Sequence, residues 1–312
     1  MQIVSVINYK GGVGKTSLTA NVAAELAYRG YDVLALDLDA QASLTFSFVT
    51  PDVWSEEYAE GRTIKSWFDS FESGEAIALE SLVFTPRKTS GRLFGHGRLD
   101  LISSHLGLIN VDLELATELS ASSLRLGKKK FISIHRRLAE GITEDLRARY
   151  DIMLIDCPPN FNIVTKTAIV ASDHLLVPAR PDYLSTLGID YLVRSVRELV
   201  NDYNDYATFA DADIDTIGPD IIGVVFTMIQ EYSGEPIAAQ RAFIMRVKQL
   251  GVVNVFEHYI KRNDTLFADA SQYGVPVVLN RYNSDSHESV VRGLELVTDD
   301  FCDALGIARR KA

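Results

Sequence analysis

The chain has 312 residues, of which 47% are hydrophobic and 23% charged, and this length suffices for one large α/β domain or two smaller ones. The composition is close to the globular average and excludes a disordered, collagen-like or coiled-coil chain. The formal net charge of −11 argues against a protein that coats nucleic acid with its whole surface, although a local basic patch remains compatible with it.

The sequence also shows whether the chain has a membrane span, a signal peptide or a cysteine framework. No apolar run reaches the roughly 18 residues that a membrane span requires. Residues 1–7 lack the charged start and long apolar stretch of a signal peptide, so we expect a cytoplasmic protein. The two cysteines, Cys157 and Cys302, are too few for a disulfide framework or a four-thiolate metal site.

Short apolar runs alternate with helical patterns along the chain, which is typical of βαβ units and a mostly parallel sheet. The runs are continuously apolar, and this favours strands covered on both faces. The predicted strands are 3–7, 33–38, 99–103, 152–155, 175–179 and 221–226. The predicted helices are 17–29, 124–149, 187–201, 240–250 and 288–305. We therefore predict a three-layer, doubly wound α/β fold with helices on both faces of the sheet.

Two stretches are less regular. Residues 50–98, which include Trp54 and Trp67, are interpreted as a short helix and a surface loop inserted in one domain that spans 1–312. Three aromatic residues stand among acidic ones after the predicted helix 187–201, and we expect them in a surface loop. They are Tyr203, Tyr206 and Phe209.

The strongest functional signal is the sequence NYKGGVGKTS at residues 8–17, which follows the first predicted strand and opens the first predicted helix. A phosphate-binding P-loop occupies this place in a βαβ unit. Its glycines let backbone N–H groups close around phosphate oxygens, and the helix N-terminus adds its positive end. Lys15 would supply a charge for the β- and γ-phosphates, and the Thr16 hydroxyl would bind Mg²⁺.

The strict pattern G-x-x-x-x-G-K-[ST] fails at its first position, where Tyr9 replaces glycine, and an extra lysine, Lys10, stands beside the glycines. Carboxylates follow two other predicted strands: Asp37 and Asp39 after one, Asp156 after the other. Ligands of open α/β sheets gather at these strand ends, so the carboxylates are candidates for holding the metal and positioning water.

These residues resemble the ParA/MinD family of deviant Walker-A ATPases, and ParA-type partitioning ATPases most. The resemblance extends over nearly the whole chain. Its motifs are residues 10–16, Asp37-Leu38-Asp39-Ala40-Gln41, 99–104, Asp156-Cys157-Pro158-Pro159, 223–228, Arg262-Asn263, Ala270-Ser271 and Gly274-Val275-Pro276.

The resemblance implies a role for each matching residue. Lys10 would reach across an ATP-sandwich dimer to the partner's phosphates, and Asp39 would position or activate the attacking water. Asp156 would bind Mg²⁺ through water, and Asn263 would contact adenine. The implied catalytic residues are Lys10, Lys15 and Asp39, and the implied metal residues are Thr16, Asp39 and Asp156. The implied nucleotide-binding residues are Lys10, Gly11, Gly12, Val13, Gly14, Lys15, Thr16, Ser17, Thr227, Met228, Lys261 and Asn263.

The implied function is a Mg²⁺-dependent ATPase that dimerises on ATP and segregates or positions a plasmid, chromosome or other cargo. A ParB-like protein or an adaptor would stimulate its slow hydrolysis. Non-specific DNA is a weaker expectation, because Thr265 stands where many relatives carry a DNA-contacting arginine, and the loop 229–235 has two acids and no base. A cargo positioner without strong DNA binding therefore stays open.

Basic residues cluster in two places and are interpreted mainly as a solvated helix face and a chain end, with DNA contact as the alternative. They are Arg125, Lys128, Lys129, Lys130, Arg136 and Arg137, then Arg309, Arg310 and Lys311. A MinD-type membrane-surface regulator is the second hypothesis, but the polar side of the predicted helix 288–305 is acidic, so we expect that helix to pack on the sheet. An electron-transfer ATPase with a shared iron cluster fits poorly with Cys157 and Cys302.

Overall fold

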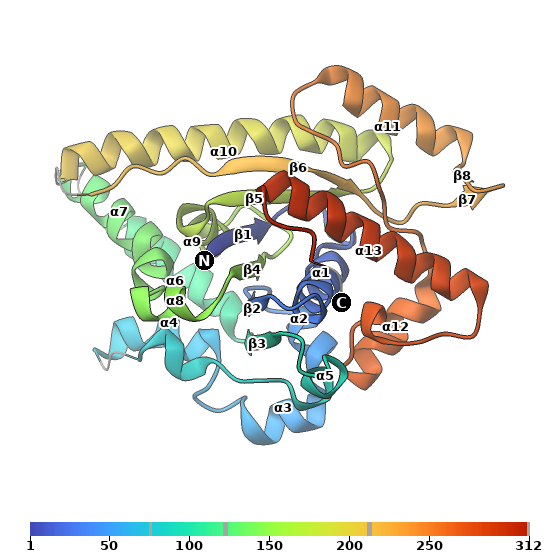
Figure 1. Ribbon diagram of the computed structural model, residues 1–312. Coiled ribbons are helices and arrows are strands. Elements are labelled where there is room, and N and C mark those ends of the chain that lie inside the picture. The colour runs from blue at the N-terminus through green and yellow to red at the C-terminus, as the bar shows by residue number, and fades with distance from the viewer. Residues whose placement is uncertain (75–76, 121–123, 211–213, 311–312) are drawn as a thin grey trace.

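The computed structural model describes residues 1–74, 77–120, 124–210 and 214–310. A parallel sheet of six strands lies at its centre, in the order β3-β2-β4-β1-β5-β6 (Figure 1). The strands are β1 (Gln2–Val6), β2 (Asp32–Asp37), β3 (Arg98–Ile102), β4 (Ile152–Asp156), β5 (His174–Ala179) and β6 (Asp220–Phe226). Each lies within one residue of its predicted bounds, so the doubly wound α/β prediction is confirmed.

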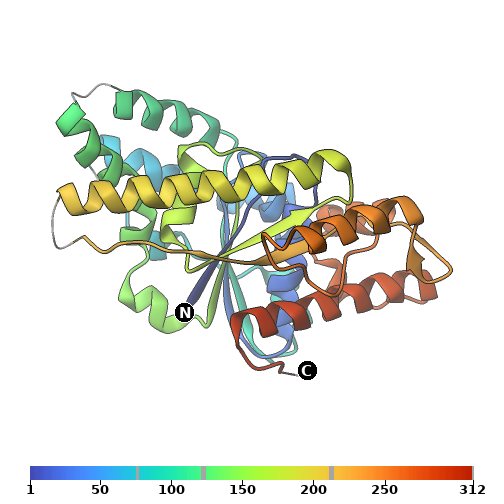
Figure 2. The same cartoon turned by 90° about the horizontal axis from the view of Figure 1, so that it is seen from above.

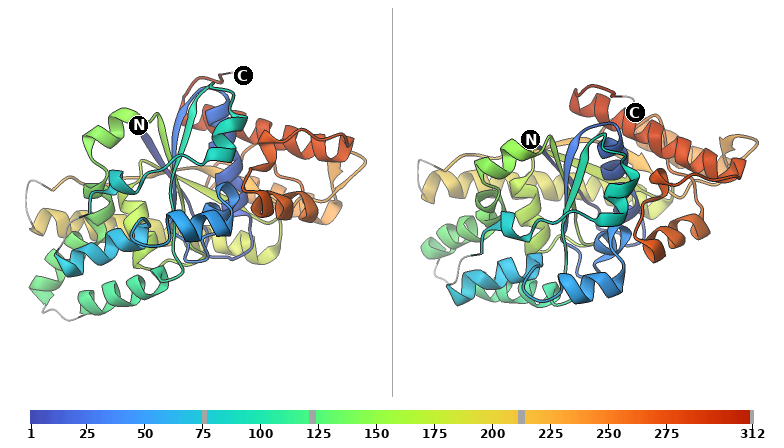
Figure 3. Two further views of the ribbon diagram at one scale, coloured as in Figure 1. Left: turned by 90° about the horizontal axis from the view of Figure 1, so that it is seen from below. Right: turned by 60° about the horizontal axis from the view of Figure 1, so that its bottom comes forward.

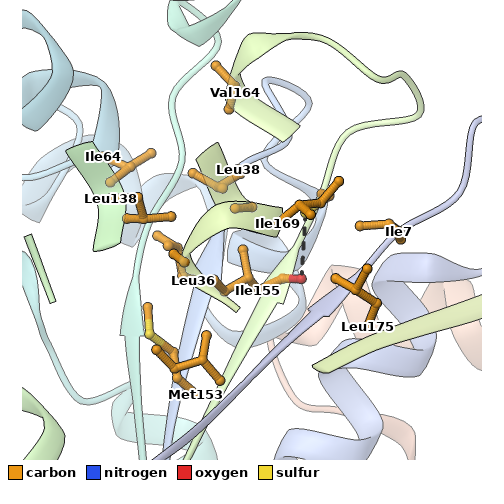
Figure 4. Close-up of a cluster of buried hydrophobic side chains, with 14 of the residues drawn as sticks. Ile7, Leu36, Leu38, Ile64, Leu138, Met153, Ile155, Val164, Ile169 and Leu175 are labelled. Carbon is orange, nitrogen blue, oxygen red and sulfur yellow. Dashed lines mark hydrogen bonds between the residues drawn. The ribbon is translucent and has the colours of Figure 1, made fainter. Parts of the chain in front are cut away.

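Helices cover both faces of the sheet (Figure 2). On one face α1 (Lys15–Tyr28), α12 (Asp264–Tyr273) and α13 (Asp285–Leu305) pack on side chains such as Val4 and Val33. On the other face lie α6 (Leu108–Ser120), α7 (Leu124–Gly141), α9 (Ile163–Ala171) and α10 (Tyr183–Ala210). Figure 4 shows this second core, in which Leu36, Met153 and Ile155 of the sheet meet Leu138 of α7 and Ile169 of α9. Helix α13 packs with its apolar side inward, as expected.

The segment 50–98 is more helical than predicted. It contains α3 (Pro51–Glu57), α4 (Ile64–Ser73), the 3₁₀ turn η1 (Leu79–Leu82) and α5 (Arg87–Arg92), with α2 (Ser43–Phe48) just before it. The prediction of one short helix failed because these helices are too short for a clear periodic pattern. Buried residues anchor α4, η1 and α5, whereas α3 has none. Trp67 of α4, for example, is only 3% exposed.

Two further predictions need correction. Tyr203, Tyr206 and Phe209 lie in helix α10, which continues to Ala210, and not in a surface loop. Tyr203 is buried with Ile132 and Ala207, because a four-residue spacing places Tyr203 and Ala207 on one side of the helix. The predicted helix 124–149 is two helices, since Thr143 caps a separate α8 (Glu144–Arg149) with its hydroxyl on the N–H of Leu146.

A small arm follows β6. It consists of the hairpin β7 (Glu231–Tyr232) and β8 (Glu235–Pro236) and helix α11 (Ala238–Leu250). Figure 3 shows this arm beside α13. No helix in the described ranges is long and apolar enough to traverse a lipid bilayer.

Candidate functional site

The glycine-rich loop connects β1 to α1 at the carboxyl edge of the sheet. Gly12 and Gly14 have φ angles of 66° and 81°, a left-handed backbone that most side chains resist. Gly14 is also the N-cap of α1, so the loop passes directly into the positive end of a helix. Asn8 braces the start of the loop: its Nδ2 donates to the carbonyl of Pro178 at 2.7 Å and its Oδ1 accepts the N–H of Lys10 at 2.9 Å.

Lys15 is the buried cation of this loop and is 7% exposed. Its Nζ donates to the backbone carbonyls of Asn8 and Lys10, both at 3.3 Å. Burial lowers the pKa of Lys15, and the negative charges of Asp156 and Asp39 oppose that shift. The ammonium group is thus folded back over its own loop.

Thr16, the residue after Lys15, forms a hydrogen-bonded pair with Asp156 at the end of β4. The Thr16 hydroxyl donates to Oδ2 of Asp156 at 2.6 Å, and the hydroxyl of Thr19 lies 3.4 Å from Oδ1. Asp156 is fully buried, and this burial raises its pKa, opposed by the Thr16 hydrogen bond and the charge of Lys15. An ionised carboxylate here is therefore short of positive charge, which a divalent cation would supply.

Asp37 and Asp39 have different surroundings although they are two residues apart. Asp37 is opposite Asp156 in the β2–β4 register and fully buried; burial, and then the charge of Asp156, raises its pKa. Its carboxylate accepts hydrogen bonds from the N–H and the hydroxyl of Thr45, both at 2.8 Å, and from the N–H of Asp39 at 3.1 Å. Asp37 therefore fixes the turn that presents Asp39 to the surface.

A cavity of about 410 Å³ opens over the loop. Gly11, Gly12, Gly14, Lys15, Thr16, Ser17 and Asp39 are among its lining residues. A second cavity of about 200 Å³ shares Gly14, Ser17, Met228 and Phe267 with the first, so the two adjoin. Thr227, Lys261 and Asn263 line the second cavity. The two together form one depression, with a larger part over the loop and a smaller, more apolar part beside it.

Residues of the smaller cavity also brace the loop and the neighbouring helix. The Thr227 hydroxyl donates to the carbonyl of Val13 at 2.6 Å, so the end of β6 holds the loop's turn. Val13 itself points into the core and is fully buried, so it can contribute only backbone groups to the cavity. Oδ1 of Asn263 caps α12 by accepting the N–H of Leu266 at 3.0 Å, which leaves Nδ2 to donate.

Lys10 does not line the cavity over its own loop. Its Nζ instead lies 2.7 Å from Oδ2 of Asp182 and 3.4 Å from the Ser185 hydroxyl, at the start of α10. Although partial burial opposes it, hydrogen bonds from Lys10 and Ser185 hold the pKa of Asp182 below its usual value. The side chains of Lys10 and Asp182 both remain about one-third exposed. The two lysines of the loop thus have separate places, one inside the cavity and one at its rim.

Sequence reasoning missed Asn8, Asp182 and Phe267. Asp182 comes three residues after the end of β5, and the argument from strand ends that selected Asp156 would also have selected it. Asn8 is the first residue of the predicted stretch 8–17, but no role was assigned to it. Phe267 carries no local signal, since only the packing of α12 brings it to both cavities.

The oxygen ligands present suit Mg²⁺. Within the described ranges no three His, Cys, Asp or Glu side chains gather into a metal cluster. Mg²⁺ does not need one, because it commonly takes one or two protein oxygens and completes its shell with phosphate oxygens and water. The hard-oxygen pair Thr16 and Asp156, with Asp39 nearby in the cavity, fits this pattern.

The predicted basic clusters are largely paired with other groups. In α7, Arg137 lies 2.9 Å from Glu118 and Lys128 lies over the ring of Tyr206 at 4.8 Å. At the chain end, Arg309 pairs with Asp303. The side chain of Arg125 and residue Lys311 lie outside the described part. These contacts favour the interpretation as solvated surface.

Comparison with known proteins agrees with this geometry. A family model described as an AAA domain, AAA_31, matches residues 1–208. The cell division protein PomZ of Myxococcus xanthus is 26% identical, over 98% of this chain and 80% of PomZ. The chromosome partitioning protein ParA of Caulobacter vibrioides is 28% identical, over 89% of this chain and 87% of ParA. The chain matches three other curated relatives over 66%, 46% and 42% of their lengths.

The fold has close counterparts among solved structures. An ATP complex of McdA from Cyanothece superposes with a TM-score of 0.69 and 20% identity, covering 100% of this chain and 99% of McdA. The six-stranded parallel sheet, the glycine-rich loop with two lysines and the family match lead to one conclusion. The chain belongs to the AAA-domain family, and proteins named for chromosome partitioning and cell division are among its relatives.

Proposed function

We propose that this protein binds ATP with Mg²⁺ in the two adjoining cavities, dimerises with ATP at the interface, and hydrolyses it slowly to segregate or position a plasmid, chromosome or other cargo. The observation that carries the proposal is the separation of the two loop lysines. Lys15 is folded over its own loop, while Lys10 stands at the rim and outside that cavity. A cation so placed is available to the phosphates of a second copy of the chain.

Each residue of the site would have its own role in ATP binding and hydrolysis. Lys15 and the backbone N–H groups of residues 11–16 would hold the β- and γ-phosphates. Asp39 would orient the attacking water, because it lines the phosphate cavity while Asp37 fixes its turn. Thr16 and Asp156 would hold Mg²⁺, which when bound neutralises charge on the phosphate oxygens. Lys10 of the partner would stabilise the charge that develops during phosphoryl transfer.

The surface around the cavities supports association of two copies. Exposed apolar side chains stand where α6 and α10 emerge from the carboxyl edge of the sheet, the edge that also carries the loop. They are Leu106, Ile109 and Leu113, then Tyr183, Leu184, Leu187 and Tyr191, with exposed fractions between 51% and 67%. The ring of Tyr191 lies 5.2 Å from that of Tyr9, so the α10 group reaches the loop itself. Apolar surface of this extent is normally covered by a partner.

We propose a ParB-like protein or a cargo adaptor as the activator, by analogy with relatives named for chromosome partitioning and cell division. Strong DNA binding near α12 is less favoured. Thr265 is exposed and uncharged, and Arg262 beside it is neutralised by Asp264 at 2.7 Å. A membrane-surface regulator of MinD type is not favoured either, because the apolar side of α13 is buried against α1.

The test of nucleotide binding is the variant Lys15→Ala, with Lys65→Ala as a control that removes a half-buried lysine paired with Asp69. By titration calorimetry with Mg-ATP, Lys15→Ala should abolish detectable binding and the control should bind like the wild type. Unchanged affinity in Lys15→Ala would refute the assignment of the loop. Phosphate release by the wild type then tests hydrolysis itself.

A further inference from the structure

A second groove lies on the other side of α12 from the nucleotide cavities. It has two lobes of about 500 and 580 Å³ that share Arg92, Asn280, Arg281 and Tyr282, so they form one continuous depression. Helix α12 is the wall between the two sites, since Phe267 faces the phosphate cavity and Tyr273 faces the groove. The other wall is α5 and the turn after it, from the inserted segment (Figure 1).

The groove carries positive charge that the protein leaves uncompensated. Lys88 and Arg92 come from α5, and Arg281 from the segment before α13. Lys88 donates to the backbone carbonyl of Tyr273 at 3.1 Å. Over the part of the chain that the structure describes, the guanidinium groups of Arg92 and Arg281 make no hydrogen bond or ion pair. In a chain of net charge −11 with abundant carboxylates, two unpaired arginines in one groove point to an anionic ligand.

Three carboxylates in the groove limit its positive character. Glu295 is paired with Arg292 at 2.8 Å, which leaves Asp269 at one end and Glu288 at the other. The basic region is therefore a short strip between acids, not a broad positive face. A strip of this kind suits a single row of phosphates better than the two rows of a duplex.

An exposed aromatic ring stands beside the strip. Phe94 lines the second lobe, is 70% exposed, and has a φ of 51°. A left-handed backbone at a non-glycine residue is strained, and a large apolar ring in solvent has no folding benefit that would offset it. Tyr282 lies in both lobes and Tyr273, 58% exposed, in the first. Cations interleaved with aromatic rings form the pattern that binds unpaired bases by stacking and their phosphates by charge.

We propose that this groove binds a single-stranded nucleic acid, with phosphates on Lys88, Arg92 and Arg281 and a base stacked on Phe94. The bases of a duplex are already stacked inside it and cannot cover Phe94. The groove is separate from the nucleotide cavities, so the proposal stands independently of ATP hydrolysis and is tested without nucleotide.

The experiment is fluorescence anisotropy with labelled oligodeoxythymidine and oligouridine of about 15 nucleotides, a length that covers known single-strand sites. The wild type should bind one or both, and a duplex of equal length at least about tenfold more weakly. The double variant Arg92→Ala/Arg281→Ala should flatten the slope of log affinity against log salt by about 1.4, since each lost single-strand phosphate contact removes about 0.7. Arg246→Ala, an exposed arginine on α11, should leave the slope unchanged.

Stacking is tested separately with Phe94→Asn, because asparagine tolerates the left-handed backbone of this position. Its affinity should fall at least about fivefold while its salt slope stays that of the wild type. The proposal is overturned if the wild type binds neither strand at low salt, or binds the duplex as tightly. Displacement of the oligonucleotide by polyglutamate of equal charge, or wild-type binding by the arginine double variant, would equally overturn it.

Discussion

Lys10 and Asp182 form an ion pair of 2.7 Å at the rim of the phosphate cavity, where the loop meets the start of α10. Asp182 also caps α10, since its Oδ1 accepts the N–H of Ser185 at 2.9 Å. The lysine proposed to act on a partner's ATP is therefore held by its own chain in the isolated subunit. The pair must open before Lys10 can cross to a second copy.

Loss of this ion pair should raise the basal rate of ATP hydrolysis by the protein without an activator. Asp182→Asn keeps a capping oxygen for α10 but removes the charge that holds Lys10. Both side chains are about one-third exposed, so the pair contributes at most about 1 kcal/mol and basal phosphate release should rise up to about fivefold. Asp190→Asn, which breaks an exposed pair with Arg194 further along α10, is the control. A decrease in phosphate release in Asp182→Asn would show that the pair is needed for turnover and does not restrain it.

The Thr227 hydroxyl should matter for ATP affinity although it belongs to a distant strand. Thr227→Val keeps the shape but loses the hydrogen bond to the Val13 carbonyl, a change of about 1 kcal/mol. We expect roughly fivefold weaker Mg-ATP binding by calorimetry, with Thr227→Ser restoring most of it. Equal affinities in the valine and serine variants would remove this brace from the account.

The buried carboxylate of Asp156 should lower the unfolding temperature of the protein in the absence of nucleotide. This carboxylate is fully buried and lacks a full counter-charge, so Asp156→Asn should unfold at a higher temperature than the wild type without nucleotide. The same variant should lose the further stabilisation that Mg-ATP gives over ATP with a chelator. Thermal melts under the three conditions test both effects. A lower melting temperature without nucleotide would contradict the stated cost.

His135 of α7 should make stability depend on pH. It is fully buried, its Nδ1 bonds the carbonyl of Phe131 at 2.7 Å, and within the described residues its Nε2 has no hydrogen-bond partner. Burial lowers its pKa to about 4, so the unfolded chain binds the extra proton first as the pH falls. Stability is then lost between about pH 6.5 and 4, by about 3 kcal/mol.

The measurement is the difference in unfolding free energy between the wild type and His135→Leu at several pH values. Groups common to both proteins, including the buried carboxylates, cancel in this difference. As the pH falls through this range, the wild type should lose stability relative to His135→Leu. A difference that does not vary with pH would mean that His135 is protonated without penalty in the folded protein.

The sequence predicted the sheet well, because its strands are continuous apolar runs whose ends carry glycines and acids. It predicted the position of the glycine-rich loop, since the P-loop pattern is local, but two of the predicted loop residues, Lys10 and Val13, do not line the cavity. It missed α12 and Phe267, because their place is determined by packing against α2 and not by their own periodicity. It placed Lys10 only by resemblance; the contact with Asp182, 172 residues away, depends on the β1–β5 pairing.

The wrong prediction of a surface loop at Tyr203 has a similar cause. Acidic residues between the tyrosines suggested a loop, whereas a four-residue spacing puts the acids on the solvent side of α10 and Tyr203 in the core. The inserted segment 50–98 was also beyond local patterns. Its short helices depend on contacts with the rest of the chain, such as the Thr89 hydroxyl to the carbonyl of Gly274.

The central claim, that Lys10 of one subunit acts on the ATP of another, is tested most directly by mixing two inactive variants. Asp39→Ala should bind ATP and dimerise without hydrolysis, and Lys10→Ala should bind ATP without turnover. In an equal mixture about half of the dimers are mixed and each has one complete site, so phosphate release should recover to about a quarter of the wild-type value. A mixture as inactive as its components, or normal hydrolysis by Lys10→Ala alone, would contradict the claim.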